Sequence, residues 1–433
     1  MKPWIARLGL VMLAAFPACS HGEDLLEIYA QARAADPLLA AADAQRGVQR
    51  ELATQARAGL LPQWSLSVAD SRAQADGARS RVAQSNLSQV LLDLSQLRSL
   101  DAAKQLASAE ESRLRAAEQA LCARVAQAYF GVLSAQAALS TAQANEDAFS
   151  QQVAQAQKRY ESGLSALIDV EQARAYHELS RGATVQAQQG LDDAREALTQ
   201  ITGRRSAELL PLLAHLPAQP PQPQDAGAWV ARALQGNPEL AAQALQLAAS
   251  ESRIGAAGAA HLPTLSLALD TERRSGTGVP ALEAGRSTSL LALRLNIPLF
   301  AGGAIESQKR QAVYQRDIQR DSLESARRAI TRETQAQYQA VLAGIALMQS
   351  SGAAVAAADR ALAATRAGQS LGTRGMTDLL LAIQTQAQAQ NAHEQARHRY
   401  VLATLLLQQA AGSLSEAELA AVNTLLQPKS GRS

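Results

Sequence analysis

The segment "RYESGLSALIDVEQARA", residues 159–175, interrupts a long run of Ala, Gln, Glu and Arg. A variant of this interruption, "GQSLGTRGMTDLLLAIQTQA", returns at residues 368–387. Ala, Gln, Glu and Arg favour helices, whereas glycine adopts the backbone conformations that a tight reversal needs. Each interruption therefore predicts the tip of a hairpin between two antiparallel helices, with Gly163 at the first tip and Gly372 at the second.

The distribution of proline predicts the length of the helices on either side. Proline is absent from residues 63–210 and 299–427, and it is poorly tolerated inside helices. At about 1.5 Å per residue, the two longest helices reach roughly 100 Å, and two shorter helices placed end to end cover a similar length. The expected long helices lie at about 95–160 and 303–368, and the shorter ones at about 38–60, 168–203, 239–260 and 377–412.

Apolar and small residues recur every seven positions in the first long helix. The row consists of Leu114, Leu121, Ala128, Ala135, Ala142 and Phe149. Such a repeat is typical of a coiled coil, and its alanines let neighbouring helices pack closely. We therefore expect the long helices to pair as antiparallel coiled coils.

The two halves of the chain are copies of one another. The segment "ADPLLAAADAQ" at 35–45 returns as "GNPELAAQALQ" at 236–246, and "LLPQWSLSVAD" at 60–70 returns as "HLPTLSLALD" at 261–270. Two copies indicate a duplication within one fold rather than an extended repeat array.

The duplication predicts the domain organisation. A first structural repeat is expected at 23–210 and a second at 225–412, each ordered helix, two strands, long helix, hairpin tip and helix. Because prolines cluster at 211–224, this segment is expected to link the repeats. Residues 413–433 form a C-terminal segment.

A period of two in hydrophobicity predicts strands. The best example has an apolar face of Leu291, Leu293, Leu295 and Ile297, which alternate with Ala292, Arg294 and Asn296. Similar alternation occurs at 64–68 and 265–269, and a weaker one at 82–91. A half-buried soluble hairpin alternates in the same way. However, no other segment offers an apolar layer broad enough to cover four such faces, so we expect lipid to cover them.

The predicted fold class is thus mainly α with a small β part, and the β part requires several chains. Four strands cannot close a barrel, and each unpaired backbone group in hydrocarbon costs several kcal/mol. Several copies must therefore share one barrel. Barrels of eight, twelve or sixteen strands all satisfy this requirement.

The N-terminal residues predict a secretory signal peptide at 1–22. Lys2 and Arg7 precede an apolar stretch at 8–16 that is too short to span a membrane. In an alternative processing, Cys19 becomes the acylated first residue of a lipoprotein, although Phe16 and Pro17 fit that processing site poorly.

Charge and residue content argue against nucleic-acid binding and catalysis. Removal of the leader balances basic against acidic residues, which leaves no basic surface for nucleic acid. If cleavage follows Cys19, Cys122 is the remaining thiol, so neither an intrachain disulfide nor a cysteine-based metal site can form. His393 and His398 are not spaced as a helical ligand pair. We expect no enzyme activity, metal or cofactor.

Six stretches, in order over about residues 24–427, resemble those of the TolC family of outer-membrane export channels. They are "QVLLDLSQLRSLDAAKQ", "RYESGLSALIDVEQARA", "LTQITG", "AHLPTLSLALD", "LNIPLFAGGAIESQKRQA" and "SLGTRGMTDLL". Membership would imply a homotrimer with a shared twelve-stranded barrel in the outer membrane and a long periplasmic α-barrel. It would also imply docking to a periplasmic membrane-fusion adaptor and to an inner-membrane transporter of ABC, RND or MFS type.

The resemblance implies roles for residues at the two tips, which would form the closed periplasmic entrance. Asp169 and Arg374 match positions that link the two hairpins, and Asp378 matches a position in an acidic pore ring. These carboxylates are also expected in first helical turns, where they favour the helix dipole. The tip residues expected to contact the adaptor are Gly163, Leu164, Ser165, Gly372 and Thr373.

Two departures from the family pattern concern the same gate. Gln369 stands where the family often has a tyrosine that tethers the second hairpin, and Leu381 stands where a second ring aspartate falls. The resemblance therefore implies a looser gate and a less acidic ring here.

The expected function is a passive exit duct of a tripartite efflux or type I secretion system in a Gram-negative outer membrane, opened by adaptor and transporter docking. One alternative is a periplasmic coiled-coil structural protein that never inserts in a membrane. Another is an outer-membrane drug-efflux factor anchored by lipid on Cys19. The resemblance favours the secretion and multidrug branch over heavy-metal exporters, and the cargo stays open between proteins and drugs.

Overall fold

The computed structural model of the chain describes residues 22–74, 77–206, 208–277, 279–280 and 285–427. Apart from Gly22, the predicted signal peptide lies outside the described residues, and so does Cys19, the site of the alternative lipidation.

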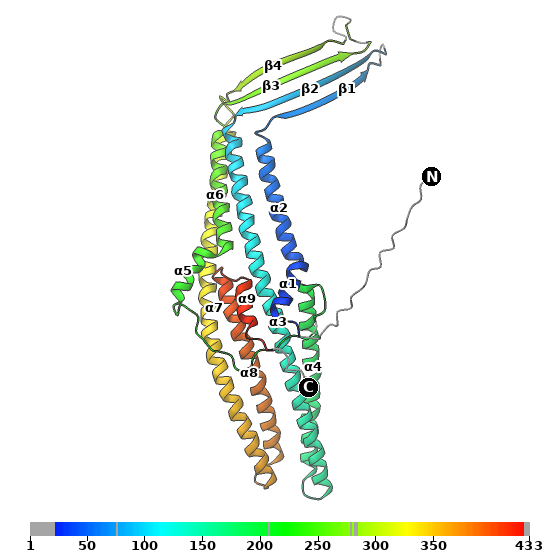
Figure 1. Cartoon of the computed structure of the whole chain (residues 1–433), viewed down its shortest axis with the longest axis vertical. Helices are drawn as coiled ribbons and strands as arrows, with labels where there is room; N and C mark the ends of the chain where they lie inside the picture. Colours follow the sequence, from blue (N-terminus) through cyan, green and yellow to red (C-terminus); the bar gives the residue numbers. More distant parts are fainter. Residues whose placement is uncertain (1–21, 75–76, 207, 278, 281–284, 428–433) are drawn as a thin grey trace, which may run out of the picture.

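The described chain is a long rod of paired helices with a sheet at one end and two hairpin tips at the other (Figure 1). The six main helices agree with the predicted ranges to within a few residues. They are α2 (Pro37–Ala58), α3 (Leu94–Glu161), α4 (Leu167–Thr202), α6 (Pro238–Ala259), α7 (Ala304–Ser370) and α8 (Met376–Ala410).

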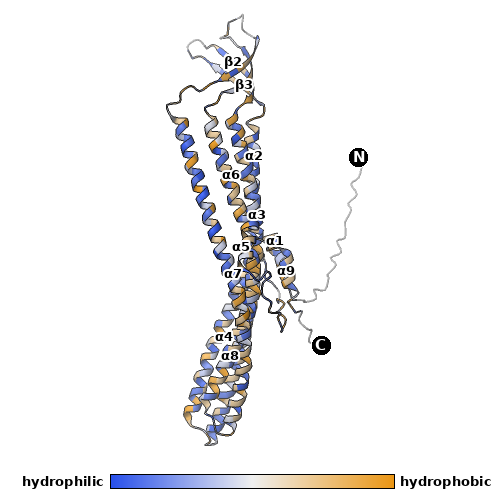
Figure 2. Cartoon of the chain, turned by 90° about the vertical axis from the view of Figure 1, so that its left-hand side faces the viewer, coloured by the Kyte–Doolittle hydropathy of each residue, from blue (hydrophilic) through white to orange (hydrophobic). Residues whose placement is uncertain are grey.

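The shorter helices pair end to end along the long ones, as their lengths predict. Helices α2 and α4 both pack on α3, and α6 and α8 both pack on α7. Hydrophobic and hydrophilic residues are interleaved along the whole rod (Figure 2), as expected for a coiled coil. One described helix, α7, contains a window that is long and apolar enough to cross a membrane, with a mean hydropathy of 1.6. Since α7 packs on α5, α6 and α8, this window belongs to the rod.

The four strands form one antiparallel sheet in the order β1-β2-β3-β4. Their bounds are β1 (Gln63–Arg72), β2 (Arg79–Leu92), β3 (Thr264–Ser275) and β4 (Ser287–Asn296). The segment with the weakest alternation is the longest strand, at 14 residues. Ile297, predicted on the strand face, follows the end of β4 and is half exposed.

Three short helices that the sequence patterns did not predict surround the middle of the rod. They are α1 (Leu25–Ala35), α5 (Ala226–Gly236) and α9 (Glu416–Asn423). The last of these lies in the C-terminal segment and holds the start of the chain, because Asn423 Oδ1 accepts from Leu25 N at 3.0 Å and Asn423 Nδ2 donates to Asp24 at 3.0 Å. Both ends of the described chain are thereby fixed to the middle of the rod.

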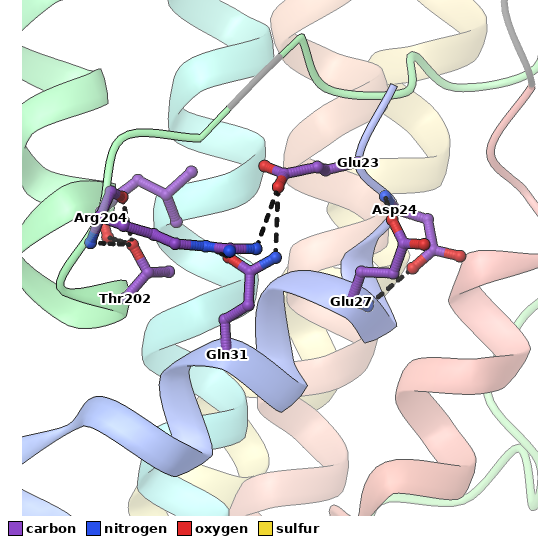
Figure 3. A network of polar contacts seen from close by, with 7 residues as sticks. Glu23, Asp24, Glu27, Gln31, Thr202 and Arg204 are labelled. Carbon is purple, nitrogen blue, oxygen red and sulfur yellow. Dashed lines mark hydrogen bonds and ion pairs between the residues drawn. The ribbon is translucent and has the colours of Figure 1, made fainter. Parts of the chain in front are cut away.

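A polar network joins the segment before α1 to the end of α4 (Figure 3). Arg204 Nε donates to Gln31 Oε1 at 2.9 Å, and its Nη2 lies 3.4 Å from Glu23 Oε1. Beneath it, the buried Tyr129 hydroxyl of α3 donates to the Leu210 carbonyl at 2.9 Å. This network and the Tyr129 contact fix the start of α1, the end of α4 and the segment at Leu210 onto α3.

The junction of α1 and α2 carries a buried ion pair. Asp36, the N-cap of α2, accepts from Leu39 N at 2.7 Å and receives both Nη atoms of Arg124 at 2.9 Å. The Arg124 hydrogen bonds, assisted by the capping bond, hold the Asp36 pKa below its usual range against the opposing effect of burial. The pair therefore fixes the bend between α1 and α2 onto α3.

A second buried polar contact joins α3 to α8. His398 is 5% exposed, and its Nδ1 lies 2.8 Å from Ser134 Oγ. Burial lowers the pKa of His398 to about 4; the nearby Glu394 opposes this shift and Arg397 adds to it. The imidazole is therefore neutral in the folded protein at neutral pH.

Protonation of His398 is expected to destabilise the fold. Because the folded state binds fewer protons than the unfolded chain between pH 6.5 and about 4, stability falls as the pH drops through that window. From pH 6.5 to 5 this group should remove about 1.5 kcal/mol. The measurement is the denaturation midpoint of wild type and His398→Gln at both pH values. An equal pH-induced loss in the two proteins would contradict the assignment.

Candidate functional site

Both predicted hairpin tips lie together at the end of the rod opposite the sheet (Figure 1). Gly163 has a φ of 72° and Gly372 a φ of 74°, in the left-handed region where side chains are unfavourable. An added Cβ would meet no atom within 4 Å at either position. The tips therefore need glycine for its backbone conformation rather than for space.

The predicted gate charges have partners within their own hairpins. Asp169, in the first turn of α4, accepts from Ser165 Oγ at 2.5 Å. Arg374 Nη1 lies 3.9 Å from Asp378 Oδ2, and Asp378 also accepts from Gly375 N at 3.3 Å. Both carboxylates thus stabilise helix starts, as predicted from their positions. A contact between Asp169 and Arg374 across the two hairpin tips stays a prediction.

A neutral contact that the sequence patterns did not indicate ties the two hairpins within one chain. Thr377 Oγ1 of α8 donates to Gln172 Oε1 of α4 at 2.8 Å. Both residues lie in the turn that follows a tip, but nothing in their spacing shows that they face each other. The contact depends on how α4 and α8 are placed side by side.

Gln369, the residue in place of the family tyrosine, lies inside its own hairpin. It is 7% exposed, and its Nε2 lies 3.6 Å from Met376 Sδ. Leu381, in place of a ring aspartate, is 55% exposed on the surface of α8. A local apolar core that includes Phe149, Leu379 and Leu380 lies between the hairpins.

The ends of the tips are apolar and exposed. Leu164 is 72% exposed at the first tip and Leu371 is 78% exposed at the second. Beside them, Thr373 Oγ1 donates to the Gly368 carbonyl at 3.0 Å, which closes the second turn. The tips therefore combine a fixed backbone with unpartnered apolar side chains.

At the other end, the register of the sheet gathers its leucines on one face. Leu291, Leu293 and Leu295 of β4 are the direct partners of Leu269, Leu267 and Leu265 of β3. Direct partners in an antiparallel sheet point to the same side. This apolar face continues through Leu87 of β2, the partner of Leu269, to Trp64 of β1, the partner of Leu87. Trp64 is 77% exposed and Leu293 is 66% exposed.

The opposite face of the sheet is polar. It carries Arg294 of β4, and Asn86 of β2 donates to Asp270 of β3 there. Strands β1 and β4 each pair with one neighbour within the described residues, so each leaves an edge open. Among those residues, no cluster of His, Cys, Asp and Glu is suited to a metal ion.

An open sheet with one apolar and one polar face, at the end of a rod of paired helices, defines a subunit of an outer-membrane channel. The chain matches outer membrane efflux proteins over residues 28–204 and 229–413, and it belongs to that family. Members of the family are channels of the Gram-negative outer membrane that extend into the periplasm, and this location holds for the present chain.

Individual relatives agree with this assignment. Outer membrane protein TolC of Vibrio cholerae is 33% identical over 99% of this chain and 99% of that protein. Alkaline protease secretion protein AprF of Pseudomonas aeruginosa is 27% identical over 91% of this chain and 85% of that protein. The solved CmeC outer membrane channel of Campylobacter jejuni has the same fold, with a TM-score of 0.79 at 17% identity over 93% of this chain and 89% of that one.

Proposed function

We propose that three copies of this chain form a passive exit duct that crosses the outer membrane and the periplasm. The observation that carries the proposal is the sheet, which combines an apolar face with two open edges. In hydrocarbon each unpaired backbone group costs several kcal/mol, so β1 of one copy must pair with β4 of the next. Three copies close a barrel of twelve strands, the number that the family resemblance implies.

A periplasmic coiled coil that never inserts in a membrane is the weaker alternative. Such a protein would leave the apolar face in water, including Trp64 and the leucines of β3 and β4. Contiguous exposed apolar patches of this kind mark interaction sites or membrane contacts. Lipid covers the face in the duct, whereas the alternative gives it no partner.

The paired tips are proposed to close the periplasmic entrance. Asp169 and Arg374 already have partners within their own hairpins, so their contact across the two tips would be modest, about 1 kcal/mol each. Several such contacts around a trimer together hold the entrance shut, yet a docking protein can shift that balance. Asp378, with Leu381 beside it in place of a second acid, would contribute a single acidic ring.

Docking at the tips is proposed to open the duct. The exposed Leu164 and Leu371, beside Gly163, Ser165, Gly372 and Thr373, offer an apolar surface to a periplasmic membrane-fusion adaptor. An inner-membrane transporter of ABC, RND or MFS type would supply the energy for transport through the proposed duct. The relative AprF is an alkaline protease secretion protein, which supports a secreted protein as cargo. Multidrug efflux is the second candidate.

Deletion of the gene tests the function directly. A deletion strain should lose secretion of at least one protein or become more sensitive to drugs, and the wild-type gene should restore the loss. In fractionated cells, the protein should appear as heat-resistant trimers in the outer-membrane fraction. Soluble periplasmic monomers would contradict the proposed duct.

The apolar face predicts a position-specific effect on insertion. Leu293→Arg should impair assembly in the outer membrane, at a cost of roughly 2–4 kcal/mol per chain near the middle of the bilayer. Arg294→Ser, on the opposite face of β4, is the matched control and should insert normally. The measurement is the yield of heat-resistant trimers in the outer-membrane fraction. Equal yields for the two variants would contradict the lipid assignment.

Charges at the tips predict the electrical behaviour of the closed entrance. Arg374→Ser and Asp169→Ala should each raise single-channel conductance in planar bilayers without altering trimer yield, because each removes one side of the proposed contact. Arg366→Ser, a change at an exposed arginine in the last part of α7, is the control. If both tip variants insert correctly and conduct like wild type, these residues act only at their helix starts.

A further inference from the structure

Four arginines gather at the end of the sheet that is farther from the helices. Arg72 ends β1, Arg79 and Arg81 begin β2, and Arg273 lies near the end of β3. All four residues are exposed. Figure 1 shows these strand ends pointing away from the rod. We refer to these four residues as the arginine rim.

The register places the arginine rim on the apolar face rather than on the polar one. Arg72 is the direct partner of Arg79, and Asp70 of Arg81, so these side chains share a face. Alternate residues along a strand also share a face. Trp64 and Arg72 of β1 therefore lie on the same face, and so do Leu269 and Arg273 of β3. In β2, Leu87 shares this face with Arg81 and Arg79.

The arginine rim carries an excess of positive charge. Among the described residues, the carboxylate that pairs with it is Asp70, which lies 2.9 Å from Arg81 Nη2. Arg72 and Arg79 face each other directly across β1 and β2. Like charges at such positions destabilise a sheet. An anion between the two guanidinium groups would replace this repulsion with two attractive contacts.

The height of the arginine rim matches the edge of a membrane. From Leu265 to Arg273, β3 rises about 27 Å at about 3.4 Å per residue. Membrane barrels have an apolar band about 25 Å tall. Arg273 therefore lies where hydrocarbon gives way to headgroups, and a long arginine side chain can extend its charged end outward from there.

We propose that Arg72, Arg79 and Arg273 bind the phosphate groups of lipid headgroups around the far end of the barrel. The inference rests on the proposed function, because it requires lipid against the apolar face. A guanidinium group presents paired donors that match phosphate oxygens. The ligand is a lipid rather than free phosphate, because the acyl chains would lie on the leucines directly below the arginine rim. Arg81, already paired with Asp70, contributes less.

Lipid selectivity of the reconstituted trimer tests the proposal. Wild type in phosphatidylcholine vesicles is mixed with spin-labelled phosphatidic acid or spin-labelled phosphatidylcholine, and electron paramagnetic resonance gives the association of each with the protein. Wild type should prefer phosphatidic acid. Arg273→Ser should lower this preference about fivefold, as expected for one arginine near a lipid surface. The combined change Arg72→Ser, Arg79→Ser and Arg273→Ser should abolish it.

Matched variants make the result specific. Arg294→Ser removes an arginine from the polar face of the same sheet and should leave the preference unchanged. Single-channel conductance confirms that every variant has inserted. If Arg273→Ser and the combined variant conduct normally and keep the preference, the lipid site is wrong and the duct stands. The proposal is also overturned if Arg294→Ser lowers the preference for phosphatidic acid as much as Arg273→Ser does. It is likewise overturned if inorganic phosphate displaces the labelled lipid more than chloride of equal ionic strength does. A wild-type protein that never inserts would overturn both this inference and the duct.

Discussion

The backbone groups along the free edges of β1 and β4 are the constraint on which the architecture depends. One chain pairs the inner edges of its sheet and leaves the outer ones open. In water such edges invite aggregation, and in hydrocarbon each unsatisfied group costs several kcal/mol. Pairing between copies satisfies both edges at once. It would also arrange the rods around a common axis, so the proposed barrel determines where the helices lie.

The duplication connects this requirement to the opposite end of the molecule. Each half contributes two strands and one hairpin, and the halves are held together by the packing of α3 on α6 and α8, by the contact of α1 with α9 and by the core around Tyr129. Because a strand pair and a tip belong to the same half, closing the proposed barrel at one end would also gather the tips at the other. A single kind of subunit can thereby provide both the passage and its entrance.

Long periodic elements could be predicted from the sequence, whereas single contacts between elements could not. Helix α3 repeats one apolar pattern over many turns, and proline is absent from both α3 and α7, so the ranges of both helices were predicted to within a few residues. Helices α1, α5 and α9 are too short for periodicity, and their remaining signals are the capping residues Asp24, Asp225 and Ser415. The Gln172–Thr377 contact and the burial of Gln369 depend on which helix faces meet, and that is decided only when the rods pack.

The distribution of packing explains why an entrance could open without loss of the rod. The middle holds the largest apolar core together with buried polar contacts such as Asp36–Arg124 and Ser134–His398. At the tips a smaller core is supplemented by the exposed Gln172–Thr377 contact. A neutral hydrogen bond contributes only about 1 kcal/mol. Separating the tip ends therefore costs far less free energy than separating the middle. A protein that binds Leu164 and Leu371 could supply the free energy needed to separate the tips.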